Sequence, residues 1–160
     1  SGAQDAIGIC VPGLSRHFYN NNYWPDKIET CMDEDILCWL EEHICMKVMF
    51  PRRPGTTVVR DCNLNEENVK ALTGAASRCW EAIMRKDLQR FAAAFKDSFE
   101  AQVKLFPGML AEGVREEIAK YKDQVLAWKM PGAGGGGYLA MVCEKPLEDS
   151  IRIKIRRRGE

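Results

Sequence analysis

Hydrophobic and polar residues follow two different periods along this chain, and the longer period predicts its helices. In several segments apolar residues recur every three or four positions, which places them on one face of an α-helix. Asp33, Asn65 and Asp87 stand at the start of three such segments, and Asp and Asn commonly cap helix N-termini. The sequence predicts helices over residues 33–47, 65–83, 87–105 and 110–125. The stripe predicted for the second helix is Val69, Leu72, Ala76, Cys79 and Ile83, and that for the third is Leu88, Phe91, Phe95, Phe99 and Val103.

The remaining ordered segments have short apolar runs or a period of two, which is typical of β-strands. Asp5 marks the start of a further helix, residues 51–57 read as a loop, and a turn-rich stretch separates the first two strands. The predicted strands are residues 13–20, 26–32, 47–50, 126–130, 138–143 and 151–156. We therefore predict a single α+β domain over residues 1–160, with a small antiparallel sheet and helices packed on one face.

Composition places limits on the kind of partner this chain binds. The chain has 160 residues with 23 Lys and Arg against 23 Asp and Glu, so the formal net charge is zero. Balanced charge gives no general attraction to nucleic acid or anionic membrane, and the "KIRRR" stretch near the C-terminus reads as a solvated strand face and tail. No apolar run is long enough to span a bilayer and no signal peptide is visible, so we expect a cytoplasmic protein.

The seven cysteines favour a reduced protein. Cys31, Cys38 and Cys45 recur every seven residues, so on a helix they would share a face. The total is odd, the chain contains no C-x-x-C motif, and it has only two histidines, which disfavours a disulfide framework or a zinc site. We expect mostly buried free thiols. Nothing supports a catalytic pair of His17 or His43 with a cysteine, and that alternative stays open.

The stretch "PGAGGGGYLAMV" at residues 131–142 holds five glycines between two predicted strands. Glycine loses the most conformational freedom on folding, so such a cluster indicates that another group must approach the backbone closely. Gly132, Gly134 and Gly137 satisfy G-x-G-x-x-G, but a strand follows where a dinucleotide site needs a helix. Tyr138 follows the run where a P-loop has Gly-Lys-Ser/Thr. Two interpretations remain, a tight strand connection and a bare loop lying against a ligand or a nucleotide-holding neighbour, and five glycines favour the second.

The segment "WKMPGAGGGGYLAMV" resembles the third signature of the GHMP kinases, a superfamily of small-molecule kinases named for galactokinase, homoserine kinase, mevalonate kinase and phosphomevalonate kinase. In that pattern a Lys precedes a short gap, a Gly-Ala-Gly-Gly-Gly-Gly run and an apolar strand. Pro131 stands where the family often has Thr or Ser. The matching residues here are Lys129, Gly132, Ala133, Gly134, Gly135, Gly136 and Gly137.

Near the other end, "GAQDAIG" resembles the family segment in which an Asp opens a helix beside the substrate. Its Gln-Asp form is most similar to the sugar kinases that act on heptose phosphates or fucose, and it puts Asp5 on the catalytic aspartate. Without the family, Asp5 reads as a helix N-cap. The serine-rich ATP motif of the N-terminal domain has no counterpart, because "VPGLSRH" at 11–17 lacks the serine run.

The resemblance therefore implies the ferredoxin-like C-terminal domain of a GHMP kinase that phosphorylates a hydroxyl of a sugar or sugar phosphate. It implies ATP and Mg²⁺ as cofactors, bound mainly by an N-terminal kinase domain that this chain lacks, and no nucleic-acid or membrane partner. The alternative is a ligand-binding or regulatory α+β module without catalysis. The residues implied for the nucleotide or phosphate loop are Gly132, Ala133, Gly134, Gly135, Gly136 and Gly137. Lys129 ranks low as a strand residue. Two interpretations of an aromatic-rich turn stay open, a sugar or phosphate pocket and the commoner structural role, and no role is assigned to its residues Arg16, His17, Tyr19, Tyr23 and Trp24.

Overall fold

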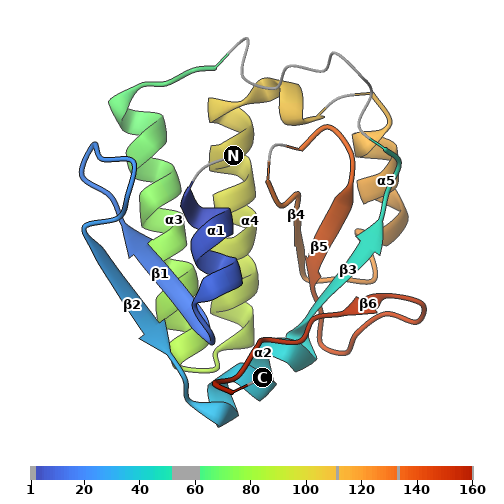
Figure 1. Cartoon of the computed structure of the whole chain (residues 1–160). Coiled ribbons are helices and arrows are strands. Elements are labelled where there is room, and N and C mark those ends of the chain that lie inside the picture. Colours follow the sequence, from blue (N-terminus) through green and yellow to red (C-terminus); the bar gives the residue numbers. More distant parts are fainter. Residues whose placement is uncertain (1–2, 52–61, 111, 133, 160) are drawn as a thin grey trace.

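The computed structural model describes residues 3–51, 62–110, 112–132 and 134–159. Its main sheet is antiparallel throughout, with the strand order β4-β5-β3-β6, and a separate antiparallel hairpin pairs β1 with β2. Figure 1 shows the hairpin and the sheet as distinct units. The strands are β1 (Leu14–Phe18), β2 (Lys27–Cys31), β3 (Ile44–Val48), β4 (Ala127–Lys129), β5 (Tyr138–Val142) and β6 (Ile151–Arg152).

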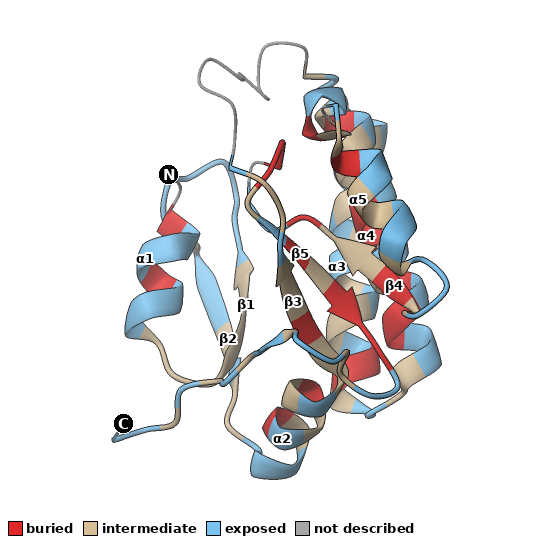
Figure 2. Ribbon diagram, turned by 90° about the vertical axis from the view of Figure 1, so that its right-hand side faces the viewer, coloured by how far each residue is buried: buried red, intermediate tan, exposed pale blue. Residues whose placement is uncertain are grey.

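The helices surround this small sheet. The two long helices α3 and α4 pack side by side, and α4 also lies along β4 (Figure 1). In Figure 2, α4, α5 and β4 lie on one side of the molecule, whereas α1 and the hairpin lie on the other. The α+β class with a small antiparallel sheet is therefore confirmed. The helices are α1 (Ala3–Cys10), α2 (Glu34–His43), α3 (Glu66–Met84), α4 (Leu88–Leu105), the 3₁₀ helix η1 (Pro107–Leu110) and α5 (Val114–Tyr121).

Three helix starts follow the capping chemistry that the sequence predicts. Asp33, Asn65 and Asp87 are the N-caps of α2, α3 and α4. In each case the side-chain oxygen accepts a hydrogen bond from the backbone N–H three residues further along, at 2.8–3.1 Å. Each bond satisfies a backbone donor that the first turn of a helix leaves without an intrahelical partner.

Strand β5 is central because alternate side chains enter two different parts of the core. Leu139 and Met141 pack with Met109 of η1 and Val114 of α5, and all four are fully buried. Val142 points into the second cluster, which α2, α3, α4 and β4 also supply. Since successive side chains of a strand face opposite sides, both faces of β5 are covered, which accounts for its wholly apolar run after Tyr138.

The prediction for residues 33–47 was wrong at its C-terminal end. Helix α2 ends at His43, and Ile44 begins β3 rather than completing the apolar helical face. Ile44 pairs with Val142 of β5, and the pairing continues to Val48 opposite Tyr138. Ile44 and Val48 are β-branched and favour extended backbone when a partner strand is present, so this long-range pairing overrides the local helical spacing.

Other predicted elements differ from the structure in extent. Strand β6 is formed only by Ile151 and Arg152, because these two residues alone pair with β3. On α3 the buried face carries Ala75 and Ala82, whereas the predicted Val69 is exposed. The last predicted helix is divided, since residues 107–110 form η1 and α5 begins only at Val114. The loop predicted at residues 51–57 lies, apart from Pro51, outside the described residues.

The cysteines do not form the shared helical face that their spacing suggests. Cys31 lies in β2, Cys38 in α2 and Cys45 in β3, so the seven-residue repeat crosses three elements. All seven cysteines are free thiols, as expected, but only Cys45 and Cys143 are buried, so the prediction of mostly buried cysteines was wrong. The sulfur atoms of these two lie 3.4 Å apart in the core.

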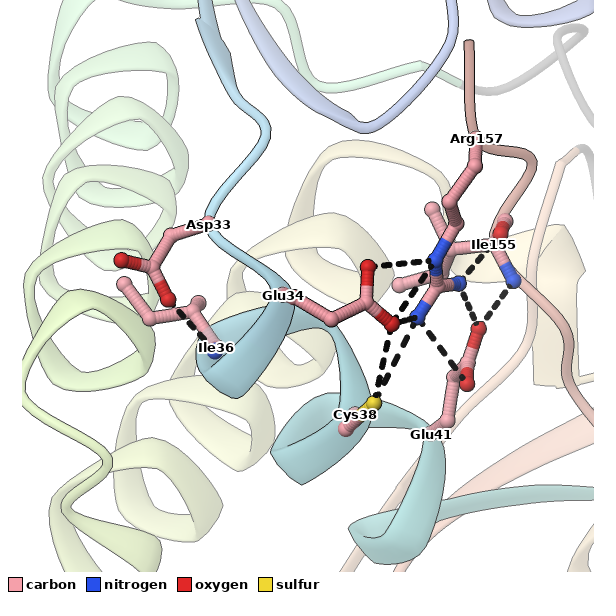
Figure 3. Close-up of polar contacts among 7 residues, drawn as sticks. All are labelled: Asp33, Glu34, Ile36, Cys38, Glu41, Ile155 and Arg157. Atoms are coloured by element: carbon pink, nitrogen blue, oxygen red, sulfur yellow. Dashed lines mark hydrogen bonds and ion pairs between the residues drawn. The ribbon is translucent and has the colours of Figure 1, made fainter. Parts of the chain in front are cut away.

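The C-terminal segment crosses α2 and is fixed there by one arginine (Figure 3). The Arg157 guanidinium donates to Glu34 Oε1 at 2.7 Å and also pairs with Glu41. Glu41 in turn accepts the backbone N–H of Ile155 at 2.5 Å. The Arg157 hydrogen bond is the main reason that the pKa of Glu34 falls to about 2. The backbone oxygen of Arg156 accepts from Gly13 N at 2.9 Å, so the segment also contacts the residue just before β1.

Within the described part of the chain, no helix combines the length and apolar character needed to cross a lipid bilayer.

Candidate functional site

The loop between β4 and β5 needs its glycines, because five of them adopt left-handed backbone angles. Gly132, Gly134, Gly135, Gly136 and Gly137 all have positive φ values, between 69° and 139°. Residues with a Cβ adopt this region only at a cost, whereas glycine enters it freely. Ala133, the remaining predicted loop residue, lies outside the described residues.

One close neighbour of this loop is Met109 of η1. A Cβ placed on Gly134 would lie 2.9 Å from side-chain atoms of Met109, closer than such contacts normally occur. The backbone N–H of Gly135 donates to the Met109 carbonyl oxygen at 3.1 Å, which fixes the loop against η1. The close approach that the glycine run indicates is therefore met, at Gly134, by packing inside the chain.

Two backbone N–H groups of the loop already donate hydrogen bonds within the chain. Besides the Gly135 bond, the Gly137 N–H donates to the Phe50 carbonyl oxygen at 2.9 Å, while Met49 N donates back to Gly137 O at 2.8 Å. On the other side, Gln102 Nε2 of α4 donates to Gly132 O at 3.3 Å. In this conformation the amides of Gly135 and Gly137 are not available to bind a phosphate group.

Asp5 lies at the other candidate position, in the first turn of α1. The helix begins at Ala3, so Asp5 lies inside it and is not the N-cap residue that the sequence also allowed. Its side chain is exposed, and it has no hydrogen bond or ion pair with any described residue. A carboxylate in the first turn is favoured by the positive end of the helix dipole. Asp5 is thus presented to solvent on a mostly exposed helix, of which only Ala3 and Ile7 are buried.

A cavity of about 460 Å³ lies between the hairpin, α3, α4 and the end of β4, and we call it the hairpin cavity. Most of its wall is apolar. Neither Asp5 nor a loop glycine lines it, and the sequence did not connect its polar members, which come from four elements. The polar side chains that line it are Ser15, Arg16, His17, Thr73, Ser77, Ser98 and Lys129, together with the indole of Trp80.

Arg16 is held firmly at one side of the hairpin cavity. It lies opposite Glu29 in the hairpin register, and its Nε and Nη2 donate to Glu29 Oε2 at 2.9 and 2.5 Å. The guanidinium carbon lies 5.1 Å from the Trp80 ring centroid and 4.8 Å from that of Phe18, within cation–π range. Hydrogen bonds from Lys27 and then Arg16 lower the pKa of Glu29. The guanidinium of Arg16 is thus held in place by Glu29 and by the two rings.

Lys129 brings a second cation to this cavity. Its Nζ donates to the Ser98 hydroxyl at 2.6 Å, and Ser98 is itself buried on α4. Burial lowers the pKa of Lys129, because removing an ammonium group from water disfavours its charged form. Ser98 is a polar residue within an Ala- and Phe-rich helical stripe. This irregularity was the feature of the sequence that could have indicated its contact with Lys129. Lys129, which ranked low as a strand residue, is thus a partly buried amine within the cavity.

The other residues of the aromatic-rich turn differ in position. His17 lines the hairpin cavity, and its Nε2 lies 3.0 Å from Ser15 Oγ. Tyr19, Tyr23 and Trp24 are exposed and do not line it. In the ranges that the structure describes, no group of three His, Cys, Asp or Glu residues is arranged to hold a metal ion, so these residues do not by themselves fit Mg²⁺.

Comparison with known proteins gives one partial match. A stretch of 74 residues, 46% of this chain, is 38% identical to the L-fucokinase/L-fucose-1-P guanylyltransferase of Bacteroides fragilis. The stretch covers 8% of that protein, so the chain corresponds to a small part of its relative. No family model matches the chain. At this coarse level the chain is related to a protein whose name includes a sugar kinase.

Proposed function

We propose that this chain is the C-terminal part of an ATP-dependent kinase that phosphorylates a hydroxyl group of a sugar or sugar phosphate. The observation that carries the proposal is the β4–β5 loop, in which five glycines have positive φ in the order of the GHMP signature. The 38% identity with a fucokinase over 74 residues supports a sugar as the substrate. The N-terminal domain of the kinase, on another segment, would bind the nucleotide and Mg²⁺.

Asp5 is the proposed catalytic residue. Its carboxylate is exposed in the first turn of α1, near the positive end of the helix dipole. ATP, when bound by the N-terminal domain, supplies the γ-phosphoryl group. Asp5 orients the substrate hydroxyl and accepts its proton as the oxygen forms its bond to phosphorus. Most of the rate enhancement in such reactions comes from positioning and charge stabilisation. Little covalent work is left for the protein, so a single exposed carboxylate is enough to orient the hydroxyl and accept its proton.

The glycine loop acts mainly as a support of the site, because Gly134, Gly135 and Gly136 are buried. Because the amides of Gly135 and Gly137 are bonded to Met109 and Phe50, we propose that the loop supports the nucleotide-holding neighbour rather than enclosing the phosphates with its own amides. Bare backbone lets another segment approach closely, as at other glycine-rich contacts. This assigns Gly132–Gly137 to the nucleotide side of the site and Asp5 to the substrate side.

The decisive experiment is an assay of the intact protein that contains this chain. We would measure ADP release with ATP and a panel of free sugars, including L-fucose, and sugar phosphates, and identify each product by mass spectrometry. We expect one sugar class to gain a single phosphoryl group. Sugar binding by calorimetry without ATP turnover would contradict the proposal and favour the alternative of a non-catalytic ligand-binding module.

A second test concerns the chain by itself. The serine-rich ATP motif has no counterpart in residues 1–160, so we expect this chain alone to bind Mg-ATP poorly. Calorimetric titration of the chain with Mg-ATP checks this. Micromolar affinity would show that the nucleotide site is formed by these residues, and the division between two domains would then be wrong.

A further inference from the structure

A second cavity, away from the glycine loop, lies between α4 and α5, and we call it the α4/α5 groove. Its volume is about 580 Å³, within the range of small-molecule sites. Figure 2 shows α4, α5 and β4 on the same side of the molecule, opposite α1 and the hairpin. The apolar side chains that line the groove are Phe99, Val103, Leu110, Ile118 and Trp128. Phe99 is buried and the other four are only partly covered, so apolar surface faces the opening.

The polar residues of the groove are almost all cationic. Lys96 and Lys104 come from α4, Arg115 from α5 and Lys122 from the end of α5, whereas Glu100 is the one acidic residue of the lining. All four cations are exposed, and none forms an ion pair with any residue that the structure describes. The whole chain has zero net charge, so this local excess is not a general property of its surface.

The order of the chain places these cations in two pairs. Helices α4 and α5 run in opposite directions, joined through η1 (Figure 1). Lys104 and Arg115 therefore lie toward the η1 end, and Lys96 and Lys122 lie toward the other end. Lys96 and Lys104 are about 12 Å apart along the helix axis, at 1.5 Å per residue. An apolar floor about two turns long is thus bordered by positive charge at both ends.

We propose that the α4/α5 groove binds a small anionic amphiphile, a molecule with an aliphatic or aromatic body and a carboxylate, sulfate or phosphate head. The body covers the apolar floor, whose burial supplies most of the affinity. The head pairs with Lys104 and Arg115, because a guanidinium can bind such groups through two parallel hydrogen bonds. A solvated helix surface would not place partly exposed Leu110, Ile118 and Trp128 together inside a ring of cations. This site is independent of the proposed kinase activity.

The test is calorimetric titration of the 160-residue chain with dodecanoate, kept below its micelle-forming concentration. The matched probe is dodecyltrimethylammonium, which has the same tail and the opposite charge. We expect saturable one-to-one binding of dodecanoate and at least tenfold weaker binding of the cationic probe, since tenfold corresponds to about 1.4 kcal/mol. Equal affinity for both probes, or no binding of dodecanoate, would overturn the proposal.

Two variants locate the site. Lys104→Glu/Arg115→Glu should weaken dodecanoate binding at least tenfold, on the order of one lost charge-assisted hydrogen bond. Ala119→Trp, which fills the groove from an exposed position on α5, should weaken it similarly without reversing any charge. Lys145→Glu/Arg158→Glu makes the same charge change at exposed positions outside the groove and should leave the affinity within about twofold, as expected for surface charges.

Circular dichroism of each variant checks that it is folded. Folded variants that bind dodecanoate like the parent would overturn the assignment to this groove, as would equal loss in the Lys145/Arg158 control. Sedimentation of the parent chain tests the other occupant, a second copy. Self-association that disappears in Ala119→Trp would assign this face to a dimer contact and overturn the proposal.

Discussion

The glycine loop and helix α1 carry the two halves of the proposed kinase site, and they differ sharply in how the fold holds them. Gly134, Gly135 and Gly136 are buried, and backbone hydrogen bonds tie the loop to η1 and to Phe50. Asp5 is exposed, on a helix of eight residues with only two buried side chains. The loop is an integral part of the core, whereas α1 contributes little to it.

Because of this difference, we expect substitutions in the loop to change stability first and substitutions at Asp5 to change activity first. A substitution in the loop changes packing and backbone strain first, so its effect on catalysis cannot be read without a stability measurement. A substitution at Asp5 alters an exposed side chain that has no hydrogen bond or ion pair with any described residue, so a change in turnover would report chemistry directly. Four predictions test this separation, in order of decreasing expected effect.

The largest effect is expected for Asp5→Asn in the intact kinase. Removing the charge while keeping the shape should lower kcat by about 10²–10⁴-fold, the usual contribution of a general base. The melting temperature should not change, because the side chain is exposed. Asp35→Asn makes the same change in the first turn of α2 and should leave kcat unchanged. Turnover within about threefold of the parent, far short of the general-base range, would remove Asp5 from the mechanism.

In the loop, Gly134→Ala should destabilise the isolated chain by about 3 kcal/mol, from left-handed strain plus overpacking against Met109. Gly132→Ala is the matched control. Gly132 also has positive φ, but nothing lies within 4 Å of a Cβ placed there, so we expect only about 1 kcal/mol from backbone strain. Urea unfolding measures both. Equal losses for the two variants would mean that the contact with Met109 adds nothing.

Lys129, at the end of β4 beside the loop, should lower the stability of the folded chain while its amine is charged. Burial lowers its pKa, so the charged amine disfavours the folded state below that pKa, and stability should rise as pH increases toward 10.5. Lys129→Met should therefore leave stability at pH 7 unchanged or raise it by about 1 kcal/mol. Ser98→Ala removes the partner hydroxyl as a control. A clear loss of stability in Lys129→Met would make this lysine structural.

The smallest effect is expected at Glu34 of α2, which belongs to neither region. Its folded-state pKa is lowered to about 2, chiefly by Arg157, from a usual value of 4.5. The contact therefore stabilises the folded chain above about pH 4.5 and is lost progressively as pH falls toward 2. Unfolding midpoints at pH 6 and pH 3 should differ less in Glu34→Gln than in the parent. Glu42→Gln, an exposed change on the same helix, should keep the parent's pH dependence.

Local chemistry in the sequence was enough to predict much of the fold. Asp33, Asn65 and Asp87 cap helices because capping depends on a few adjacent residues. The end of α2 could not be predicted in the same way, because Ile44 continues the helical apolar spacing and only its pairing with Val142 makes it extended. Likewise "IRIKIR" keeps its alternation, but pairing with β3 stops at Arg152.

The candidate site also has features that adjacent residues determine and features that depend on contacts between distant segments. The need for a close approach at the glycine run was predictable, since glycine alone enters left-handed backbone without strain. The identity of the neighbour, Met109, was not predictable. Met109 precedes Gly134 by 25 residues in the sequence and approaches it only through the packing of η1. The hairpin cavity was missed for this reason too, as Arg16 and Lys129 are brought together from opposite ends of the chain. The assignments of Asp5 and the loop glycines stay predictions.

The C-terminal segment gives the molecule a defined route for mechanical force. A pull at residue 159 reaches α2 first through the paired charges of Arg157 with Glu34 and Glu41 (Figure 3). It reaches the hairpin through the hydrogen bond between Arg156 and Gly13, ahead of the two-residue pairing of β6 with β3. Tension on this end would therefore act on α2 and on the start of β1, a wall of the hairpin cavity, before it loads the pairing of β6 with β3.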